Sequence, residues 1–245
     1  MNPSAIIVGV GAHEGLGAAV CRRFAREGLH VWVAGRTQAK IDAVAQAIRD
    51  QGGSAQSVLT DATREDEVIR LFDTACAPRT DIAPPSVVVF NAGNNDLIPL
   101  LDLTAQQFES FWRVGCHAGF LVGREAVRRL LPLRRGTVLF TGASGSLRGK
   151  AGFAHFAAAK AGLRMLSQSM AREFGPQGLH VAHVVIDGGI HGERLLSKLP
   201  FLADVRGENG LLHVDAIADT YWQLHQQHPS AWTQEIDLRP FKEEF

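Results

Sequence analysis

Three closely spaced glycines, Gly11, Gly15 and Gly17, lie between an apolar run that ends at Val10 and a segment of helical period that begins at Leu16. Glycines at such a turn let the backbone approach a phosphate, and the helix N-terminus then offers free N–H groups and the positive end of its dipole. The alternative is a glycine-rich surface turn without a ligand. Because the turn directly follows a predicted strand and opens a helix, we predict that it binds the pyrophosphate of a dinucleotide.

A basic residue stands where a dinucleotide site discriminates between cofactors. A classical NAD site has an acidic residue about 20 residues beyond the glycine turn, where it binds the ribose 2′-hydroxyl. This chain has Arg36 there, with Lys40 one turn further along, and a guanidinium can pair with a 2′-phosphate. Glu14 favours NAD instead, since its carboxylate would repel that phosphate. Alternatively, Arg36 is a solvated surface residue that binds no cofactor. We predict NADP as the cofactor, with NAD less favoured.

Short apolar or β-branched runs alternate with longer segments of helical period along the chain. The predicted strands are Ala5–Val10, His30–Ala34, Ala55–Leu59, Val87–Phe90, Thr137–Phe140 and His180–Ile186. The predicted helices are Leu16–Glu27, Gln38–Asp50, Arg64–Ala75, Gln106–Leu131 and Phe153–Phe174. This alternation is typical of βαβ units. We therefore predict a single α/β domain over residues 1–245, with a doubly wound parallel sheet of the Rossmann type.

Three segments fall outside this alternation. Arg79–Ser86 contains two adjacent prolines and is predicted to be a surface loop before the fourth strand. Residues 188–210 are long and irregular, and we predict that they form a substrate lid. The C-terminal segment Trp232–Pro240 predicts a last strand followed by a tail.

Composition narrows the range of partners. Lys and Arg total 25 and Asp and Glu total 25, so no net charge attracts nucleic acid or an anionic membrane. No apolar run approaches the ~20 residues of a membrane-spanning helix, and the start of the chain lacks a signal-type segment. Cys21, Cys76 and Cys116 form no pair with metal or redox spacing, and no other cluster predicts a metal. We expect a cytoplasmic protein with reduced thiols and a small-molecule substrate.

Four motifs, in order along the chain, resemble those of the short-chain dehydrogenases/reductases. They are the wide glycine spacing Gly11-x-x-x-Gly15-x-Gly17, Asp61 after the third strand, Asn91-Ala92-Gly93 after the fourth, and the run Ala157–Gly162. The resemblance covers residues 11 to about 186. It implies that Gly11, Gly15, Leu16 and Gly17 bind the cofactor phosphates, that Asp61 contacts the adenine, and that Asn91, Ala92 and Gly93 also bind the cofactor.

The resemblance also implies where catalysis takes place, and there the chain departs from the family. The family pattern is Tyr-x-x-x-Lys, but this chain has Phe156 four residues before Lys160. The family serine maps onto Ala143, with Ser144 next to it, and a structural asparagine maps onto Cys116. A phenyl ring cannot donate a proton. Lys160 retains a role, because its ammonium can bind the nicotinamide ribose and lend positive charge near a reacting carbonyl.

His117 and His155 lie beside the altered positions, and an imidazole with a pKa of about 6.5 can transfer protons. His155 is rotated by about 100° from Phe156 on a helix, so we favour a structural role for both histidines. Two functions stay open: an NADP(H)-dependent oxidoreductase acting on a small carbonyl or conjugated enone with altered proton chemistry, and a catalytically impaired NADP(H)-binding protein or partner subunit. The resemblance also implies a homodimer or homotetramer, assembled through helices Gln106–Leu131 and Phe153–Phe174.

Overall fold

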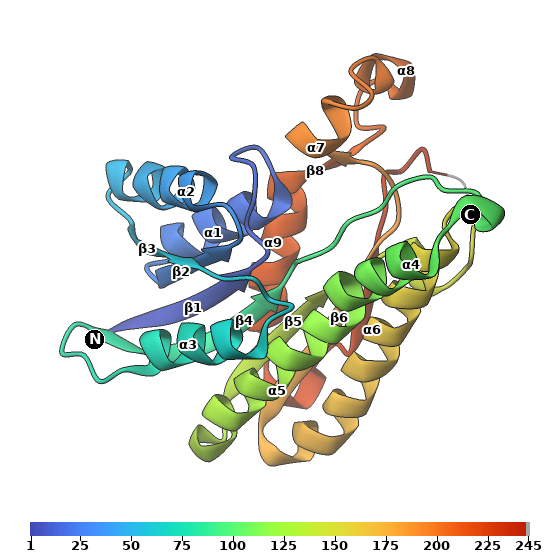
Figure 1. Cartoon of the computed structure of the whole chain (residues 1–245). Coiled ribbons are helices and arrows are strands. Elements are labelled where there is room, and N and C mark those ends of the chain that lie inside the picture. Colours follow the sequence, from blue (N-terminus) through green and yellow to red (C-terminus); the bar gives the residue numbers. More distant parts are fainter. Residues whose placement is uncertain (244–245) are drawn as a thin grey trace.

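A parallel sheet of seven strands forms the centre of the computed structural model, which describes residues 1–243 (Figure 1). The strands are β1 (Asn2–Val8), β2 (His30–Gly35), β3 (Ser54–Leu59), β4 (Ile82–Phe90), β5 (Gly136–Thr141), β6 (Leu179–Ile186) and β9 (Glu235–Leu238). Their order is β3-β2-β1-β4-β5-β6-β9. The chain therefore winds outward in one direction from β1 and in the other from β4. The predicted doubly wound sheet, including its last strand, is confirmed.

Helices cover both faces of this sheet (Figure 1). One face carries α1 (Leu16–Arg26), α2 (Gln38–Asp50) and α9 (Val214–His225), and the other carries α3 (Glu65–Cys76), α5 (Ala118–Leu130) and α6 (Ala154–Phe174). α4 (Ala105–Trp112) packs beside α6. Single-turn 3-10 helices occupy Leu100–Asp102, Leu131–Leu133, Ser144–Ser146, Gly175–Gln177 and Pro229–Ala231. Among residues 1–243, no helix combines the length and the apolar character that a membrane span requires.

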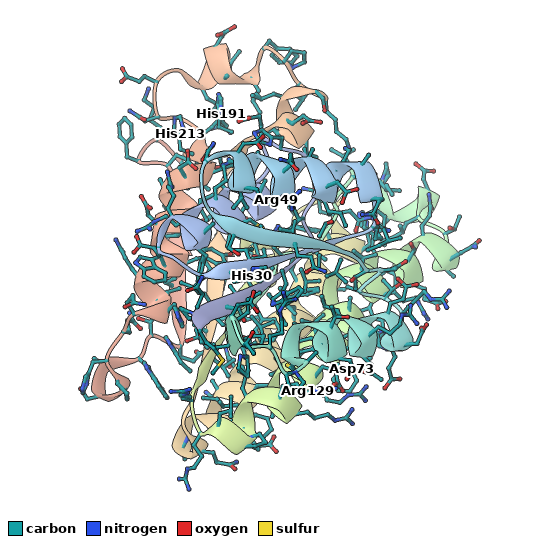
Figure 2. The ribbon with its side chains drawn as sticks, turned by 90° about the vertical axis from the view of Figure 1, so that its left-hand side faces the viewer. His30, Arg49, Asp73, Arg129, His191 and His213 are labelled. Carbon is teal, nitrogen blue, oxygen red and sulfur yellow. The ribbon has the colours of Figure 1, made fainter. Side chains whose placement is uncertain are left out.

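Strand side chains alternate between two cores. On β1, Ala5 and Ile7 pack under α1, α2 and α9, whereas Ile6 and Val8 pack under α3, α5 and α6. This is the period of two expected of a strand covered on both faces, and it explains why residues 5–8 of β1 are all apolar. Figure 2 shows a surface contact on the second face, where Arg129 of α5 lies 2.7 Å from the carboxylate of Asp73 on α3.

The predicted loop Arg79–Ser86 is wrong in its second half, because β4 begins at Ile82 and contains both prolines. In this part β4 pairs only with β1, since β5 joins it from Val87 onward. The pairing with β1 also shifts register around Ser4. Prolines lack the N–H that a regular ladder needs, and an irregular strand start with one neighbour tolerates them.

The predicted helix Gln106–Leu131 is present from Ala105 to Leu130, with one π-helical turn at Arg113–His117 between α4 and α5. In this turn and directly after it, the chain packs very closely on α6. An added Cβ on Gly119 would come within 2.3 Å of Leu163, and one on Gly115 within 2.9 Å of Ala159. The small residues thus hold α5 directly against the helix that carries the predicted catalytic positions.

Residues 188–210 contain more regular structure than the sequence predicts. β7 (Ile190–His191), α7 (Glu193–Leu196) and α8 (Leu202–Arg206) lie in this segment, and β8 (Leu212–His213) follows it and pairs with β7. In Figure 1 these elements stand at the top of the molecule, beyond the carboxyl ends of the strands. α9, which follows directly, is a helix that the sequence analysis did not identify.

Candidate active site

A cleft of about 850 Å³ opens at the carboxyl ends of the strands, beside the switch between β1 and β4. Ligands of doubly wound sheets bind at this position. Every residue predicted to bind the cofactor or to act in catalysis lines this one cleft: Gly11, Gly15, Leu16, Gly17, Arg36, Asp61, Asn91, Ala92, Gly93, Ser144, Phe156 and Lys160. The fold therefore brings together motifs that lie far apart in the sequence.

The glycine turn between β1 and α1 leaves room for a phosphate. A Cβ atom added to Gly11 would meet no other atom within 4 Å, so this glycine borders open space. α1 begins after Gly15 without a side-chain cap and without an acidic residue in its first turn. The N–H groups at the start of α1 are therefore not taken by a capping side chain, and the turn fits the pyrophosphate of a dinucleotide.

Two glycines hold this turn against the end of β4. An added Cβ on Gly17 would lie 3.1 Å from the Gly9 carbonyl oxygen and 3.1 Å from Nδ2 of Asn91. Gly9 has a φ of +92°, and an added Cβ there would lie 2.4 Å from the Ala92 nitrogen. Gly9 was not among the predicted site residues, although a glycine two residues before the motif was the available signal.

The two basic residues predicted to select NADP are accessible. Arg36 and Lys40 are exposed, line the cleft, and form no ion pair within residues 1–243. Glu14, which argued against a 2′-phosphate, is not part of the cleft wall, and its carboxylate lies 3.7 Å from the imidazole of His13. The charge at this end of the cleft is therefore more favourable to a phosphate than the sequence alone indicated.

Asp61 stabilises the connection from β3 to α3. Its Oδ1 accepts hydrogen bonds from the backbone N–H of Thr63 at 3.0 Å and from the Thr63 hydroxyl at 2.8 Å. The Asp61 N–H donates to the carboxylate of Glu67 on α3. This arrangement fixes the carboxylate at the wall of the cleft.

A hydrogen-bonded chain of side chains underlies the centre of the cleft. Asn91 donates to the Gly9 carbonyl at 3.3 Å and accepts from the Thr141 hydroxyl at 3.1 Å. The Thr141 hydroxyl also lies 2.7 Å from the hydroxyl of Tyr221 on α9. Tyr221 is the one tyrosine of the chain and is fully buried, and burial raises the pKa of its phenol. It supports the site from below and is not a substitute for the tyrosine that the family places on α6.

Lys160 is held at the floor of the cleft with 5% of its surface exposed. Its Nζ donates to the Thr141 carbonyl at 2.8 Å. Burial, and to a smaller extent the charge of Arg194, lowers the pKa of Lys160 to about 8. A lysine in this state is largely charged at neutral pH but can release its proton much more readily than a surface lysine.

Phe156 lies one turn before Lys160 on α6 and packs its ring edge against Gly145, where an added Cβ would lie 3.0 Å away. Ser144 also lines the cleft, next to Ala143. Its hydroxyl bonds to the buried Asp187, to which Arg148 donates at 2.8 and 2.9 Å. Burial alone would raise the pKa of Asp187, but the bonds from Arg148 and Ser144 outweigh it and lower the pKa. This ion pair between the exposed Arg148 and the buried Asp187 was not predicted from the sequence.

The two histidines considered as proton donors do not line the cleft. His155 is fully buried, and its ring centroid lies 4.1 Å from that of Phe111. His117 stacks on Trp112 at 5.8 Å. Cys116, in the π-helical turn, packs on Gly162 of α6, and burial raises the pKa of its thiol. The geometry agrees with the structural role favoured for both histidines.

The segment predicted as a lid is tied to the loop that follows β4. Arg194 donates to the Gly93 carbonyl at 2.7 Å and to the Asn95 carbonyl at 3.5 Å. Lys198 forms an ion pair with Asp96. These contacts place α7 across the catalytic end of the cleft.

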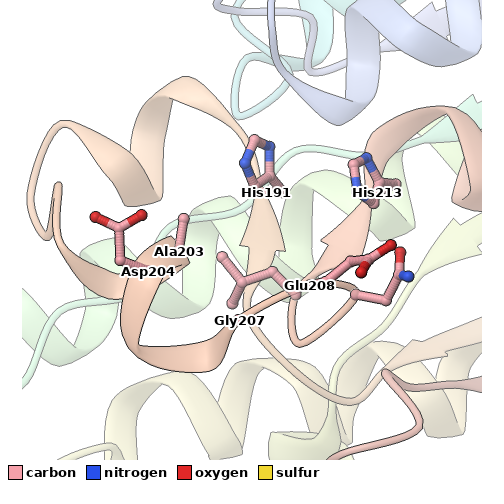
Figure 3. Close-up of a pocket in the computed structure, with 8 residues that line it drawn as sticks. His191, Ala203, Asp204, Gly207, Glu208 and His213 are labelled. Atoms are coloured by element: carbon pink, nitrogen blue, oxygen red, sulfur yellow. The ribbon is translucent and has the colours of Figure 1, made fainter.

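A second, smaller hollow lies within that segment, away from all predicted site residues (Figure 3). His191 and His213 stack there at 5.3 Å between ring centroids, and Asp204 and Glu208 line the same hollow. Within residues 1–243, no group of three or more His, Cys, Asp or Glu side chains is arranged to hold a metal ion.

The order of the strands, the glycine turn at the switch point and the cleft beside it define a Rossmann-type α/β protein. Comparison with known proteins gives its family. A model of the short chain dehydrogenase family matches residues 5–192, and the chain belongs to this family of oxidoreductases.

Individual relatives agree with this assignment. A crystal structure of a short-chain dehydrogenase from Rhodopseudomonas palustris is 38% identical, with a TM-score of 0.81 over 98% of this chain and 100% of that one. Cis-4-hydroxycyclohexanecarboxylate dehydrogenase from Sinomonas cyclohexanicum is 33% identical over 82% of this chain and 78% of its own length. Gluconate 5-dehydrogenase from Gluconobacter oxydans is 27% identical, and the match spans 70% of this chain and 66% of that protein.

Proposed function

We propose that the protein is an NADP(H)-dependent oxidoreductase that transfers hydride to or from a small carbonyl or conjugated enone, with a proton donor other than the family tyrosine. The observation that carries this proposal is the convergence of all the predicted site residues on one cleft. A bound nicotinamide would supply or accept the hydride. The names of the two curated relatives describe hydroxy acids, so alcohols and ketones that bear a carboxylate are among the first substrates to test.

The cofactor would be held by contacts whose form fits a dinucleotide. The open space at Gly11 and the uncapped start of α1 accommodate the pyrophosphate. Arg36 and Lys40 provide positive charge for a 2′-phosphate at one end of the cleft. Lys160 lines the other end, where it would bind the nicotinamide ribose and stabilise negative charge on the substrate oxygen.

The proton step distinguishes this chain from a standard ketone reductase. Phe156 fills the tyrosine position with a ring that carries no exchangeable proton, and Tyr221 is buried on the other side of Thr141. Lys160 is the ionisable group on α6 that lines the cleft, and its pKa of about 8 allows it to give up a proton. We propose that it delivers the proton to the substrate oxygen, directly or through water.

The presence of Phe156 at the position expected for the proton donor supports a second candidate function, an NADP(H)-binding protein or partner subunit with impaired turnover. General acid catalysis contributes about 10²–10⁴-fold to a rate, so the loss of the tyrosine could leave binding intact and turnover negligible. Titration with NADPH and NADH, followed by assays of NADPH oxidation in the presence of panels of ketones and enones, separates the two candidates. Tight NADPH binding with turnover of at least one panel supports the enzyme, and tight binding without any turnover supports the second candidate.

Assembly and closure remain proposals as well. We propose a homodimer or homotetramer built through α4, α5 and α6, because Phe108, Trp112, Phe120 and Met165 expose 39–51% of their surface on these helices. Such aromatic and apolar exposure favours a subunit interface. Light scattering of the purified protein, with Trp112→Glu as the disrupting variant, tests the assembly.

We propose that residues 188–210 act as a substrate lid, supported by the contacts of Arg194 with the loop after β4.

A further inference from the structure

The catalytic end of the cleft combines apolar walls with an uncompensated cation. The apolar side chains here are Leu97, Val114, Phe153, Phe156, Leu195 and Leu199. Among the charged residues that line this end, Lys198 is neutralised by Asp96. Asp61 lies at the opposite end of the cleft, after β3. Arg194 and Lys160 therefore set the charge beside Phe156.

Arg194 is oriented by bonds that leave its charge intact. Its guanidinium donates to the carbonyl oxygens of Gly93 and Asn95, which carry no net charge. It forms no ion pair with any carboxylate in residues 1–243. A guanidinium has five N–H donors, so donors remain for a further acceptor after these two bonds.

Arg194 and Lys160 both lie next to Gly93. Both approach Gly93: Arg194 bonds its carbonyl at 2.7 Å, and Nζ of Lys160 lies 3.3 Å from the point where a Cβ on this glycine would be. The two cations thus flank one residue of the cleft wall. A substrate whose oxygen reaches Lys160 can place a second, anionic group within reach of Arg194.

We propose that Arg194 is a specificity-determining residue that binds a carboxylate of the substrate, and that the substrate is a hydroxy or oxo acid with an apolar body. This inference rests on the proposed function, since it concerns the substrate of the same reaction. The planar fork of an arginine matches a carboxylate in a bidentate manner. The apolar side chains around it would contact the carbon skeleton between the carboxylate and the reacting oxygen.

The expected size of the preference for an acid over its uncharged analogue follows from the solvent exposure of Arg194. Arg194 is solvent-exposed, and its charge is therefore partly screened by water and salt. We expect a discrimination of about tenfold between an acid and its uncharged analogue, rather than the much larger factors of a buried pair. Higher ionic strength should reduce this discrimination.

The test uses binding, so that it does not depend on turnover. The protein is first titrated with NADP, which tests the proposed function alone. The saturated complex is then titrated with cyclohexanecarboxylate and with its methyl ester, which share an apolar ring and differ in charge. We expect the acid to bind about tenfold more tightly than the ester in the wild type, and Arg194→Met to remove this difference while ester binding stays the same.

Lys198→Met is the matched control, because it removes a lid cation that is already paired with Asp96. It should keep the preference for the acid, and Arg194→Lys should restore part of it. Equal binding of acid and ester to the wild type, or an acid preference that survives Arg194→Met, would overturn the inference and leave the proposed function standing. A loss of NADP affinity in Arg194→Met equal to its loss of acid affinity would assign the arginine to the cofactor instead. Absence of NADP binding to the wild type would overturn both the proposed function and this inference.

Discussion

The two ends of the cleft differ in how much of the family pattern they keep. The end formed by β1, β2 and α1 has the glycine turn, an accessible Arg36 and an ordered Asp61. The end formed by β5 and α6 has Lys160, but the resemblance assigns the family's tyrosine to the position of Phe156 and its serine to the position of Ala143. Cofactor binding depends mainly on backbone shape, whereas proton transfer depends on single hydroxyl groups. One end can therefore persist while the chemistry of the other changes.

The largest effect should come from closing the cofactor end. Gly11→Val would place a side chain in the open space that a pyrophosphate needs. We expect NADPH affinity to fall by about 100-fold or more, a loss of about 2.7 kcal/mol, with an unchanged melting temperature. Calorimetric titration and thermal denaturation measure the two quantities.

Gly17→Val is compared with Gly11→Val, because it changes the packing of the turn as well as the space for the phosphate. An added Cβ there lies 3.1 Å from the Gly9 carbonyl oxygen and from the Cα of Val10, so that this variant should lose stability as well as affinity. If Gly11→Val bound NADPH as tightly as the wild type does, the glycine turn would not be part of the cofactor site.

The next largest effect should come from restoring the catalytic end. Phe156→Tyr, combined with Ala143→Ser, would place a phenol one turn from Lys160 and a hydroxyl at the serine position. We expect NADPH oxidation with simple ketones to rise by about 10–100-fold, within the range of a general acid. Steady-state rates on a ketone panel provide the measurement.

Two controls define this gain. Phe156→Leu alters the same position without a hydroxyl and should give no increase. Tyr221→Phe removes the one native phenol, which is buried against Thr141. It should leave turnover unchanged and cost about 1 kcal/mol of stability through the lost hydrogen bond. Strong wild-type turnover of ketones that Phe156→Tyr does not change would show that the missing phenol does not limit the rate, and that an acid already present, Lys160 in our proposal, supplies the proton.

The fold could be predicted from the sequence because the central strands contain short apolar runs that are buried on both faces. β1, β2 and β6 are mostly apolar, and the helices between the strands have a clear amphipathic period. The start of β4 could not be predicted, since Pro84 and Pro85 are accommodated by a register shift against β1. Whether a strand can include these prolines depends on the strand with which it pairs, and the local sequence does not identify that partner.

The site could be predicted where it depends on local motifs. The glycine turn and Asn91-Ala92-Gly93 each follow a predicted strand directly. Lys160 lies on a helix that was predicted from its sequence pattern. Tyr221 and Asp187 could not be predicted, because their partners Thr141 and Arg148 come from distant segments. Arg194 was missed for the same reason, since its role depends on the contact between the lid segment and the loop after β4.

A smaller effect should distinguish the two cofactors at the intact end. Arg36→Ala removes an exposed cation that forms no ion pair within the described residues. We expect NADPH affinity to fall by about tenfold, or about 1.4 kcal/mol, and NADH affinity to stay the same, because only NADPH carries the 2′-phosphate. Titration of the wild type and the variant with both cofactors measures this. A preference for NADH that is unaffected by the substitution would show that the prediction of NADP is wrong.

The smallest effect concerns the charge that the catalytic end retains. The pKa of Lys160 is lowered to about 8, chiefly by burial and then by the charge of Arg194. A lowered lysine pKa means that the ammonium loses its proton as pH rises through about 8, whereas an ordinary lysine stays charged to about 10.4. If this ammonium binds the nicotinamide ribose, NADPH affinity should decrease by about threefold to fivefold between about pH 7 and pH 9, since the neutral amine is the weaker donor. Lys160→Arg keeps its charge throughout this range and should give a flat profile. Arg194→Met removes the neighbouring cation and should move the decrease to higher pH. A fluorescence titration of NADPH at several pH values separates these cases, and a decrease of the same size in Lys160→Arg would assign the pH dependence to a group other than Lys160.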